Sequence, residues 1–256
     1  MARLTVCLEL FFTDLPLAER LGRVKDAGFD AGEFWGWRDK DLEAIARSAQ
    51  RHQVAITSLT AMSIHPGLTD ATKHEEFVAA VRESAEAAKR VHCPNLIVMA
   101  GNVLPSVPRS RQLANIVEGL QKLAPVAEKA AVTLVLELLN SRYDHPGYFL
   151  DNSEEMGLII RAVNHPNVKA LYDIYHAGIM EGNIIENIRA NIGTIGHFHA
   201  AGIPGRNEPW LGEQNYPAIC RAIDELGFTG YIGLEYRPTK DHRRSLVETR
   251  EWFLGS

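Results

Sequence analysis

Apolar residues along the chain fall into short runs that are separated by longer, charged segments. The runs are rich in β-branched and aromatic residues, which favour strands. They span 4–12, 31–36, 55–62, 94–101, 132–140, 168–176, 195–203 and 230–238. In the intervening segments, such as 17–29, 73–91, 114–130 and 216–228, apolar residues recur every three or four positions, which is typical of amphipathic helices. The pattern therefore predicts eight strands, each followed by helical sequence.

Eight strand and helix pairs in 256 residues match the number and length expected for a (β/α)8 TIM barrel of the α/β class. A doubly wound open sheet is the alternative fold. That fold normally has a glycine-rich phosphate turn after its first strand, whereas FFTDLPL follows here. We see no linker rich in Gly, Ser or Pro and no low-complexity segment, so we expect residues 1–256 to form a single domain.

Composition excludes several classes of protein. The chain has 27 basic and 32 acidic side chains, a net charge of −5, and no basic cluster, which argues against nucleic acid and anionic membranes as partners. No apolar run reaches the roughly 18 residues of a membrane span, and we expect an unprocessed, soluble protein. Three cysteines, widely spaced and without a C-x-x-C pattern, indicate buried thiols in a reducing cytoplasm.

Polar residues stand at the ends of the last four apolar runs. In TIM barrels the carboxyl ends of the strands meet at one mouth, where the chemistry takes place. Residues two apart on a strand share a face, so each of these polar residues can point inward together with the residue two positions before it. The four are Glu137, Asp173, His199 and Glu235.

These four residues predict a metal site. A single carboxylate at a strand end is often structural, bonding a loop amide or a basic side chain. Three carboxylates and an imidazole converging without compensation would repel one another and be costly to desolvate, so a cation between them is the simplest explanation. Oxygen-rich ligation with one nitrogen suits Mn²⁺, Mg²⁺ or Co²⁺. We expect one divalent metal ion at this mouth.

Three further residues are candidates for substrate contact. His176 follows Asp173 by three positions and could lean over the mouth, with a capping or packing histidine as the alternative. Arg206 lies in the loop GIPGRNEP after the seventh run, where its planar guanidinium could bind a carboxylate; a solvated loop arginine is the alternative. His65, after the third run, either contacts substrate or supports its loop.

The segment GEFWGW is expected to place aromatic residues and a buried carboxylate at the mouth. Trp35 and Trp37 are expected to form a hydrophobic wall, and Glu33 to be a buried carboxylate beside it rather than a catalytic group. His197 should face inward one layer below His199, as a core histidine with satisfied hydrogen bonds.

Several motifs make the chain resemble the hydroxypyruvate isomerase family within the xylose isomerase-like barrels, nearly from end to end. They are GFDAGEFWG, VMAGNV, ELLNSRYDHPGYFLDN, LYDIYHAGIMEGN, IGHFHAAGIPGRNEP and GYIGLEYRP. The resemblance implies the same four metal ligands. It also implies proton transfer by Glu137 and Glu235 and substrate contacts from His176 and Arg206.

The resemblance implies conversion of hydroxypyruvate to tartronate semialdehyde through an enediolate. A ketose 3-epimerase acting on neutral sugars is an alternative, favoured by His199 and disfavoured by Tyr143, where those enzymes carry a second glutamate. A non-catalytic sugar-binding barrel is another. A barrel nuclease would need more histidines and a basic groove. The expected partner is a small sugar or sugar acid, and the number of associating chains is left open.

Overall fold

The chain folds into a closed barrel of eight parallel strands arranged in sequence order. The computed structural model describes residues 3–62 and 67–254. The strands are β1 (Arg3–Cys7), β2 (Ala31–Phe34), β3 (Ala55–Thr60), β4 (Asn95–Met99), β5 (Thr133–Glu137), β6 (Val168–Asp173), β7 (Ile195–Ala200) and β8 (Tyr231–Leu234). Each predicted apolar run contributes one strand, and the closed order confirms the predicted (β/α)8 TIM barrel.

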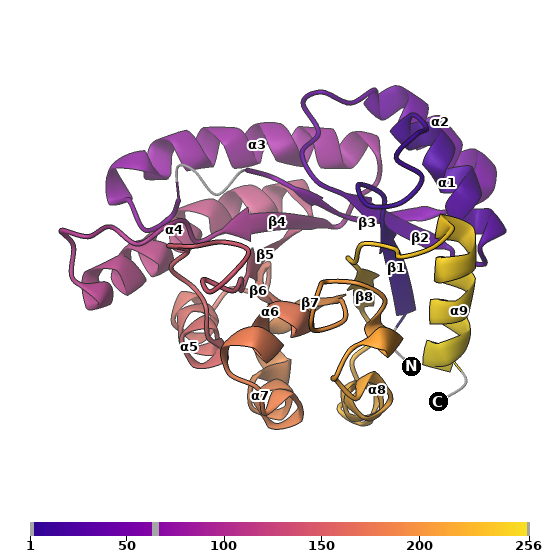
Figure 1. Cartoon of the computed structure of the whole chain (residues 1–256). Helices are drawn as coiled ribbons and strands as arrows, with labels where there is room; N and C mark the ends of the chain where they lie inside the picture. The colour runs from indigo at the N-terminus through magenta and orange to yellow at the C-terminus, as the bar shows by residue number, and fades with distance from the viewer. Residues whose placement is uncertain (1–2, 63–66, 255–256) are drawn as a thin grey trace.

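Helices surround the barrel (Figure 1). They are α1 (Leu17–Asp26), α2 (Leu42–His52), α3 (His74–Arg90), α4 (Arg109–Ala130), α5 (Ser153–Val163), α6 (Ile174–Met180), α7 (Ile184–Asn191), α8 (Tyr216–Glu225) and α9 (His242–Leu254). Short 3₁₀ turns are η1 (Ala71–Lys73), η2 (Ile192–Thr194) and η3 (Pro209–Leu211). The helices bury one stripe against the strands, as their periodicity predicts: in α1 the buried residues are Leu21 and Val24, three positions apart.

Strand alternation separates the barrel interior from the surrounding core. On β5, Leu134 and Leu136 belong to the large core between strands and helices. Val135, between them, packs instead in a small interior cluster with Ile97 and Leu171. Because side chains alternate with a period of two, the next inward position after Val135 is Glu137. The strand therefore aims a carboxylate at the mouth by the same pattern that fills its interior.

The register of the last four strands brings their ends to one rim. Paired Cα positions are Glu137 with Leu171, Asp173 with His199, and His199 with Gly233. Glu235 follows β8 directly, and its backbone N–H donates to the carbonyl of Ala200 at the end of β7. Neighbouring parallel strands are thus in step where the polar residues occur.

The strands end before their apolar runs do, and for the run 168–176 the structure shows the cause. The run 168–176 reads as a single apolar strand, but β6 ends at Asp173 and α6 begins at the next residue. The cause is a helix cap, because Oδ1 of Asp173 accepts the backbone N–H of His176 at 3.0 Å. His176 therefore lies on a helix. Helix α4 also begins earlier than the predicted 114, at Arg109.

The structure also bears on the predictions made for the cysteines, for membrane spans and for His65. All three cysteines are free thiols, with Cys7 and Cys93 buried and Cys220 half-buried. Among the residues that the structure describes, no helix has the length and apolar character needed to cross a membrane. His65 lies outside the described residues, and the cellular compartment stays a prediction.

Candidate metal centre

The four strand-end residues meet at the barrel mouth. Each of Glu137, Asp173, His199 and Glu235 is buried and offers one ligand atom, and these atoms all lie within 4.8 Å of one another. In octahedral coordination with bonds of about 2.1 Å, adjacent ligand atoms are about 3 Å apart and opposite ones about 4 Å. The cluster is therefore consistent with a site for one divalent metal ion.

The His199 ring is oriented toward the carboxylates. Its Nδ1 lies 3.1 Å from Oε1 of Glu137 and 3.4 Å from Oε2 of Glu235. The same nitrogen lies 3.9 Å from Oδ2 of Asp173. Nδ1 is therefore the nitrogen that a cation in this cluster would meet, and Nε2 points away from the three acids.

The end of β6 fixes the Asp173 carboxylate. Its Oδ1 caps α6, which leaves Oδ2 as the oxygen that faces the cluster. Oδ2 lies 3.6 Å from Nε2 of His176. Because the cap satisfies a helix donor that would otherwise lack a partner, strand termination and ligand orientation have the same physical cause.

Both carboxylate oxygens of Glu235 accept hydrogen bonds. Trp35, at the end of β2, donates its Nε1–H to Oε1 at 2.8 Å. Arg206 donates from Nη2 to Oε2 at 2.5 Å. Arg206 has a left-handed backbone with φ of 57°, which is uncommon for a long side chain. Its carbonyl accepts the N–H of Arg237 at 2.7 Å, which helps the loop to hold that conformation.

Burial disfavours the negative charge of the three carboxylates in the cluster. Burial raises the pKa of Asp173 to about 7. Burial alone would also raise the pKa of Glu235, but His199 and Arg206 hold it well below its ordinary value. Burial opposes a charge on His199, yet Glu235 and Glu33 hold the imidazole pKa well above its ordinary value. A protonated imidazole and Arg206 thus balance the acids, and a divalent cation would serve the same purpose.

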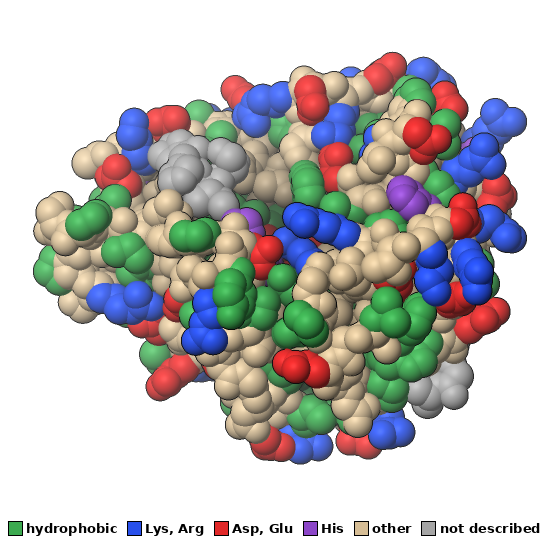
Figure 2. Space-filling model, viewed as in Figure 1, with side chains coloured by type: hydrophobic (Ala, Val, Ile, Leu, Met, Phe, Trp, Pro, Cys, Tyr) green, Lys and Arg blue, Asp and Glu red, His purple; other side chains and the backbone are tan. Residues whose placement is uncertain are grey.

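A cavity of about 750 Å³ opens above the cluster. Its lining includes Glu137, His199 and Glu235 together with Arg206. Much of the remaining lining is a largely apolar wall formed by Trp35, Trp37, Thr60, Ala61, Met62, Ile97 and Met99, and the charged residues Arg38 and Asp39 also line the cavity. Figure 2 shows acidic, basic and histidine side chains gathered near the centre of the face turned to the viewer. The tryptophans therefore line the mouth of their own barrel, as the predicted wall requires.

His176 is fully buried beside Asp173, is not among the residues that line the cavity, and is a neutral donor. Oδ1 of Asn140 accepts the backbone N–H groups of Tyr143 and Asp144, which fixes the amide so that Nδ2 donates to Nδ1 of His176 at 2.6 Å. The ring proton then sits on Nε2, for which no hydrogen-bond partner exists among the described residues. Burial also lowers the pKa of His176 well below its ordinary value. The ring thus presents an N–H toward Asp173.

Sequence reasoning missed two features of the site. His145 lines the cavity, and its ring lies edge-on to His176 with centroids 5.4 Å apart. Tyr148 is buried and donates to the carbonyl of Glu137 at 2.9 Å. The only signal for either residue is the position of DHPGY soon after the fifth strand. Loop residues show no periodicity from which their direction could be deduced.

Known proteins share this architecture. A family model described as xylose isomerase-like TIM barrel matches residues 21–254. A human protein named "Putative hydroxypyruvate isomerase" is 32% identical over 269 residues, covering 98% of this chain and 95% of its own. The 2-oxo-tetronate isomerase of Cupriavidus necator is 36% identical over 166 residues, which cover 65% of this chain and 64% of that protein. The crystal structure titled AP endonuclease, family 2, from Brucella melitensis has a TM-score of 0.91 at 29% identity, covering 100% of this chain and 99% of that one.

The family model spans nearly the whole barrel, from α1 to the end of α9. The human relative aligns along almost the full chain. The chain therefore belongs to the xylose isomerase-like TIM barrel family.

Proposed function

We propose that this protein is a divalent-metal-dependent isomerase that moves a proton along a small hydroxycarbonyl acid. The leading reaction is conversion of hydroxypyruvate to tartronate semialdehyde. One observation carries the proposal: four buried candidate ligand atoms lie within 4.8 Å of one another, and three of their residues line the cavity that also holds Arg206, a group suited to a substrate carboxylate. The names of the human and Cupriavidus necator relatives, both isomerases, support this choice.

The four residues Glu137, Asp173, His199 and Glu235 would hold Mn²⁺, Mg²⁺ or Co²⁺. The cation would supply Lewis acidity at the substrate carbonyl and stabilise the enediolate charge. The protein supplies the proton transfers and the binding contacts.

Two glutamates are placed to move the proton. Oε1 of Glu137 and Oε2 of Glu235 lie 3.1 and 3.4 Å from the same nitrogen of His199. Glu137 ends β5 and Glu235 directly follows β8, and these two strands flank β6 and β7. One of them takes a proton from the hydroxymethyl carbon of hydroxypyruvate, and a proton returns to the neighbouring carbonyl carbon. The hydroxyl proton moves from the first carbon's oxygen to the second's, so atoms and electrons balance.

Arg206 and His176 are the proposed substrate contacts. To bind a substrate carboxylate, the Arg206 guanidinium would give up or share its bond to Glu235. That exchange would release Glu235 to act as the base. The buried Nε of Arg206 has no hydrogen-bond partner among residues 3–62 and 67–254, which leaves it a further donor to offer. His176 would offer its Nε2–H, whose nitrogen lies 3.6 Å from Oδ2 of Asp173.

A second candidate is a ketose 3-epimerase on neutral sugars. The cavity of about 750 Å³, with a largely apolar wall, has room for a six-carbon sugar as well as a three-carbon acid. Epimerisation uses the same proton abstraction, but the proton returns to the opposite face of the same carbon.

Incubation in deuterated water separates these functions. Protein loaded with Mn²⁺ is mixed with hydroxypyruvate, with 2-oxo-tetronate and with a neutral ketohexose, and NMR measures deuterium incorporation and product. We expect deuterium exchange with both acids, an aldehyde product from hydroxypyruvate and a 3-oxo acid product from 2-oxo-tetronate. Turnover of the ketohexose alone would replace the proposal with epimerisation. Ligand binding without exchange in any substrate would identify a non-catalytic sugar-binding barrel.

A further inference from the structure

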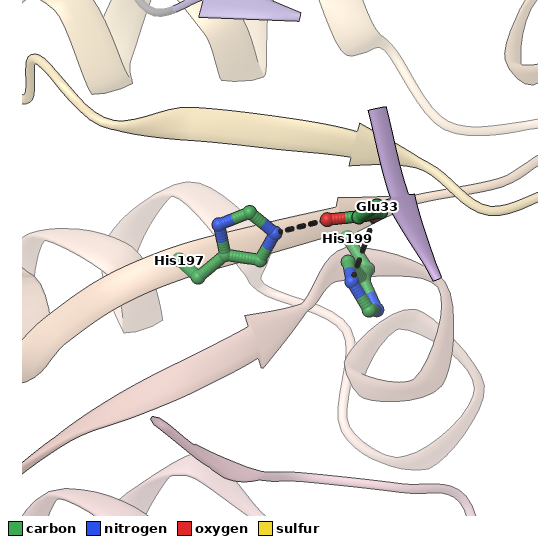
Figure 3. Close-up of side chains that lie close together, drawn as sticks. All are labelled: Glu33, His197 and His199. Atoms are coloured by element: carbon green, nitrogen blue, oxygen red, sulfur yellow. Dashed lines mark hydrogen bonds and ion pairs between the residues drawn. The ribbon is translucent and has the colours of Figure 1, made fainter. Parts of the chain in front are cut away.

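A glutamate from the opposite side of the barrel supports the back of the metal cluster. Glu33 lies on β2, and its side chain meets two histidines of β7 (Figure 3). Oε2 accepts the Nε2–H of His197 at 2.8 Å. Oε1 lies 3.2 Å from Nε2 of His199, a hydrogen-bonding distance, but the N–H does not point directly at the oxygen. Among the described residues, neither Oε1 of Glu33 nor Nε2 of His199 has another hydrogen-bond partner, so a small rotation of either side chain would let them bond to each other.

The barrel holds Glu33 firmly in this place. The residue is 2% exposed, and Oε2 also accepts the Ser58 hydroxyl at 2.9 Å. The pairing of β2 with β3 shifts register between Gly32 and Phe34, so the irregularity falls on Glu33 itself. Such bulges commonly re-aim a side chain beside an active site.

A glycine on β8 leaves the room that this contact needs. A Cβ atom placed on Gly233 would lie 2.1 Å from Oε1 of Glu33 and 2.7 Å from Cδ2 of His199. Any other residue at position 233 would therefore push the two side chains apart. Strands β2, β7 and β8 thus combine to bring one carboxylate oxygen to one imidazole nitrogen.

We infer that Glu33 is a positioning residue for the proposed metal centre. It accepts the Nε2–H of His199 and so holds the imidazole in the tautomer whose Nδ1 lone pair faces the cation. His197 in turn fixes Glu33. Ligating histidines commonly donate their second N–H to a carboxylate, which orients the ring and makes the ligand more basic. This inference rests on the proposed metal-dependent function, because it assigns the cation to Nδ1.

A purely structural role for Glu33 makes a different prediction. In that case its loss would lower stability, as for any buried ionic group, and leave the cation affinity of the folded protein unchanged. Glu208 is a matched control, because it is also fully buried and bonds Thr239 and Ser245 rather than His199. Glu208→Gln should therefore destabilise the protein while binding metal as the wild type does.

The test measures Co²⁺ and Mn²⁺ affinity by competition with a fluorescent chelator, and the visible spectrum of bound Co²⁺. We expect Glu33→Gln to weaken binding roughly 10- to 100-fold and to change the Co²⁺ spectrum, because the ligand ring is no longer held. Glu33→Asp, which keeps the charge, should recover part of the affinity. In a His199→Ala background, adding Glu33→Gln should cost nothing further, since the glutamate acts through that ring.

Several outcomes would overturn the inference. Wild-type affinity and an unchanged spectrum in folded Glu33→Gln would make Glu33 structural while the metal centre itself stands. Equal losses in Glu33→Gln and Glu208→Gln would show a general effect of destabilisation. If Glu33→Gln does not fold, Ser58→Ala, which only loosens Glu33, should still weaken binding by a few fold; wild-type affinity there would count against the inference. Wild-type protein that binds neither ion would overturn the proposed function itself.

Discussion

The two halves of the barrel mouth differ in chemistry although they share one architecture. Strands β5 to β8 supply the carboxylates and imidazole of the cluster. Strands β1 to β4 and their loops supply the largely apolar wall, with Trp35, Ile97 and Met99 among its residues. The comparison teaches that carboxylates and an imidazole gather where neighbouring strands end around one point, whereas the other half mainly shapes the cavity and contacts the cluster through Trp35 and Glu33.

The comparison can be tested first by removing the cation on which the charged half is proposed to act. Dialysis against a chelator should abolish isomerase activity, and Mn²⁺ should restore it, because the enediolate charge would have no counter-charge. Activity is measured on hydroxypyruvate, with circular dichroism as the control for folding. Full activity in protein shown by elemental analysis to be metal-free would contradict the assignment.

Loss of one glutamate in the charged half should have the next largest effect. Glu235→Gln keeps the side-chain shape but removes the proposed base, so we expect kcat to fall by about 10³-fold, in the range of general base catalysis. Steady-state kinetics on hydroxypyruvate measure the loss. Glu208→Gln, a buried glutamate bonded to Thr239 and Ser245, is the control and should retain most of the activity. Ordinary turnover in Glu235→Gln would remove that residue from catalysis.

Arg206 tests whether the charged half also selects the substrate. Arg206→Ala should raise KM for a carboxylate substrate roughly 30-fold, about 2 kcal/mol for a charged hydrogen bond, and affect a neutral ketose less. Arg206→Lys keeps the charge without the planar fork and should fall between the two. Equal losses for the acid and the neutral sugar would show that Arg206 acts only through Glu235.

Trp35 tests the contribution of the apolar half and should have the smallest effect. Trp35→Phe keeps a ring in the wall but removes the hydrogen bond to Glu235. Because Trp35 is 41% exposed, water can partly replace that bond, so we expect kcat to fall about 5-fold, equivalent to about 1 kcal/mol. Trp37→Phe is the matched control, since its Nε1–H donates to Ser84 instead. The same loss in both variants would mean that the wall acts by shape alone.

Periodicity accounts for what could be predicted of the site. The strand pattern gives the barrel, and a period of two places Glu137 inward together with Val135. It does not show that Asp173 caps a helix, because capping depends on where the strand stops. It also does not reveal the partners of His199, since Glu33 and the β7 histidines are brought together across the barrel; His197 and Glu33 are 164 positions apart in the chain.

The sequence by itself determined the barrel and the four inward residues at its mouth, because alternation along a strand is a local property. Only the tertiary structure decided which nitrogen of His199 faces the acids, which residues hold Glu235 and Glu33, and which residues line the cavity. The physical reason is that strand parity fixes a direction, whereas a contact across a barrel also depends on register, on a bulge in β2 and on the missing side chain at Gly233.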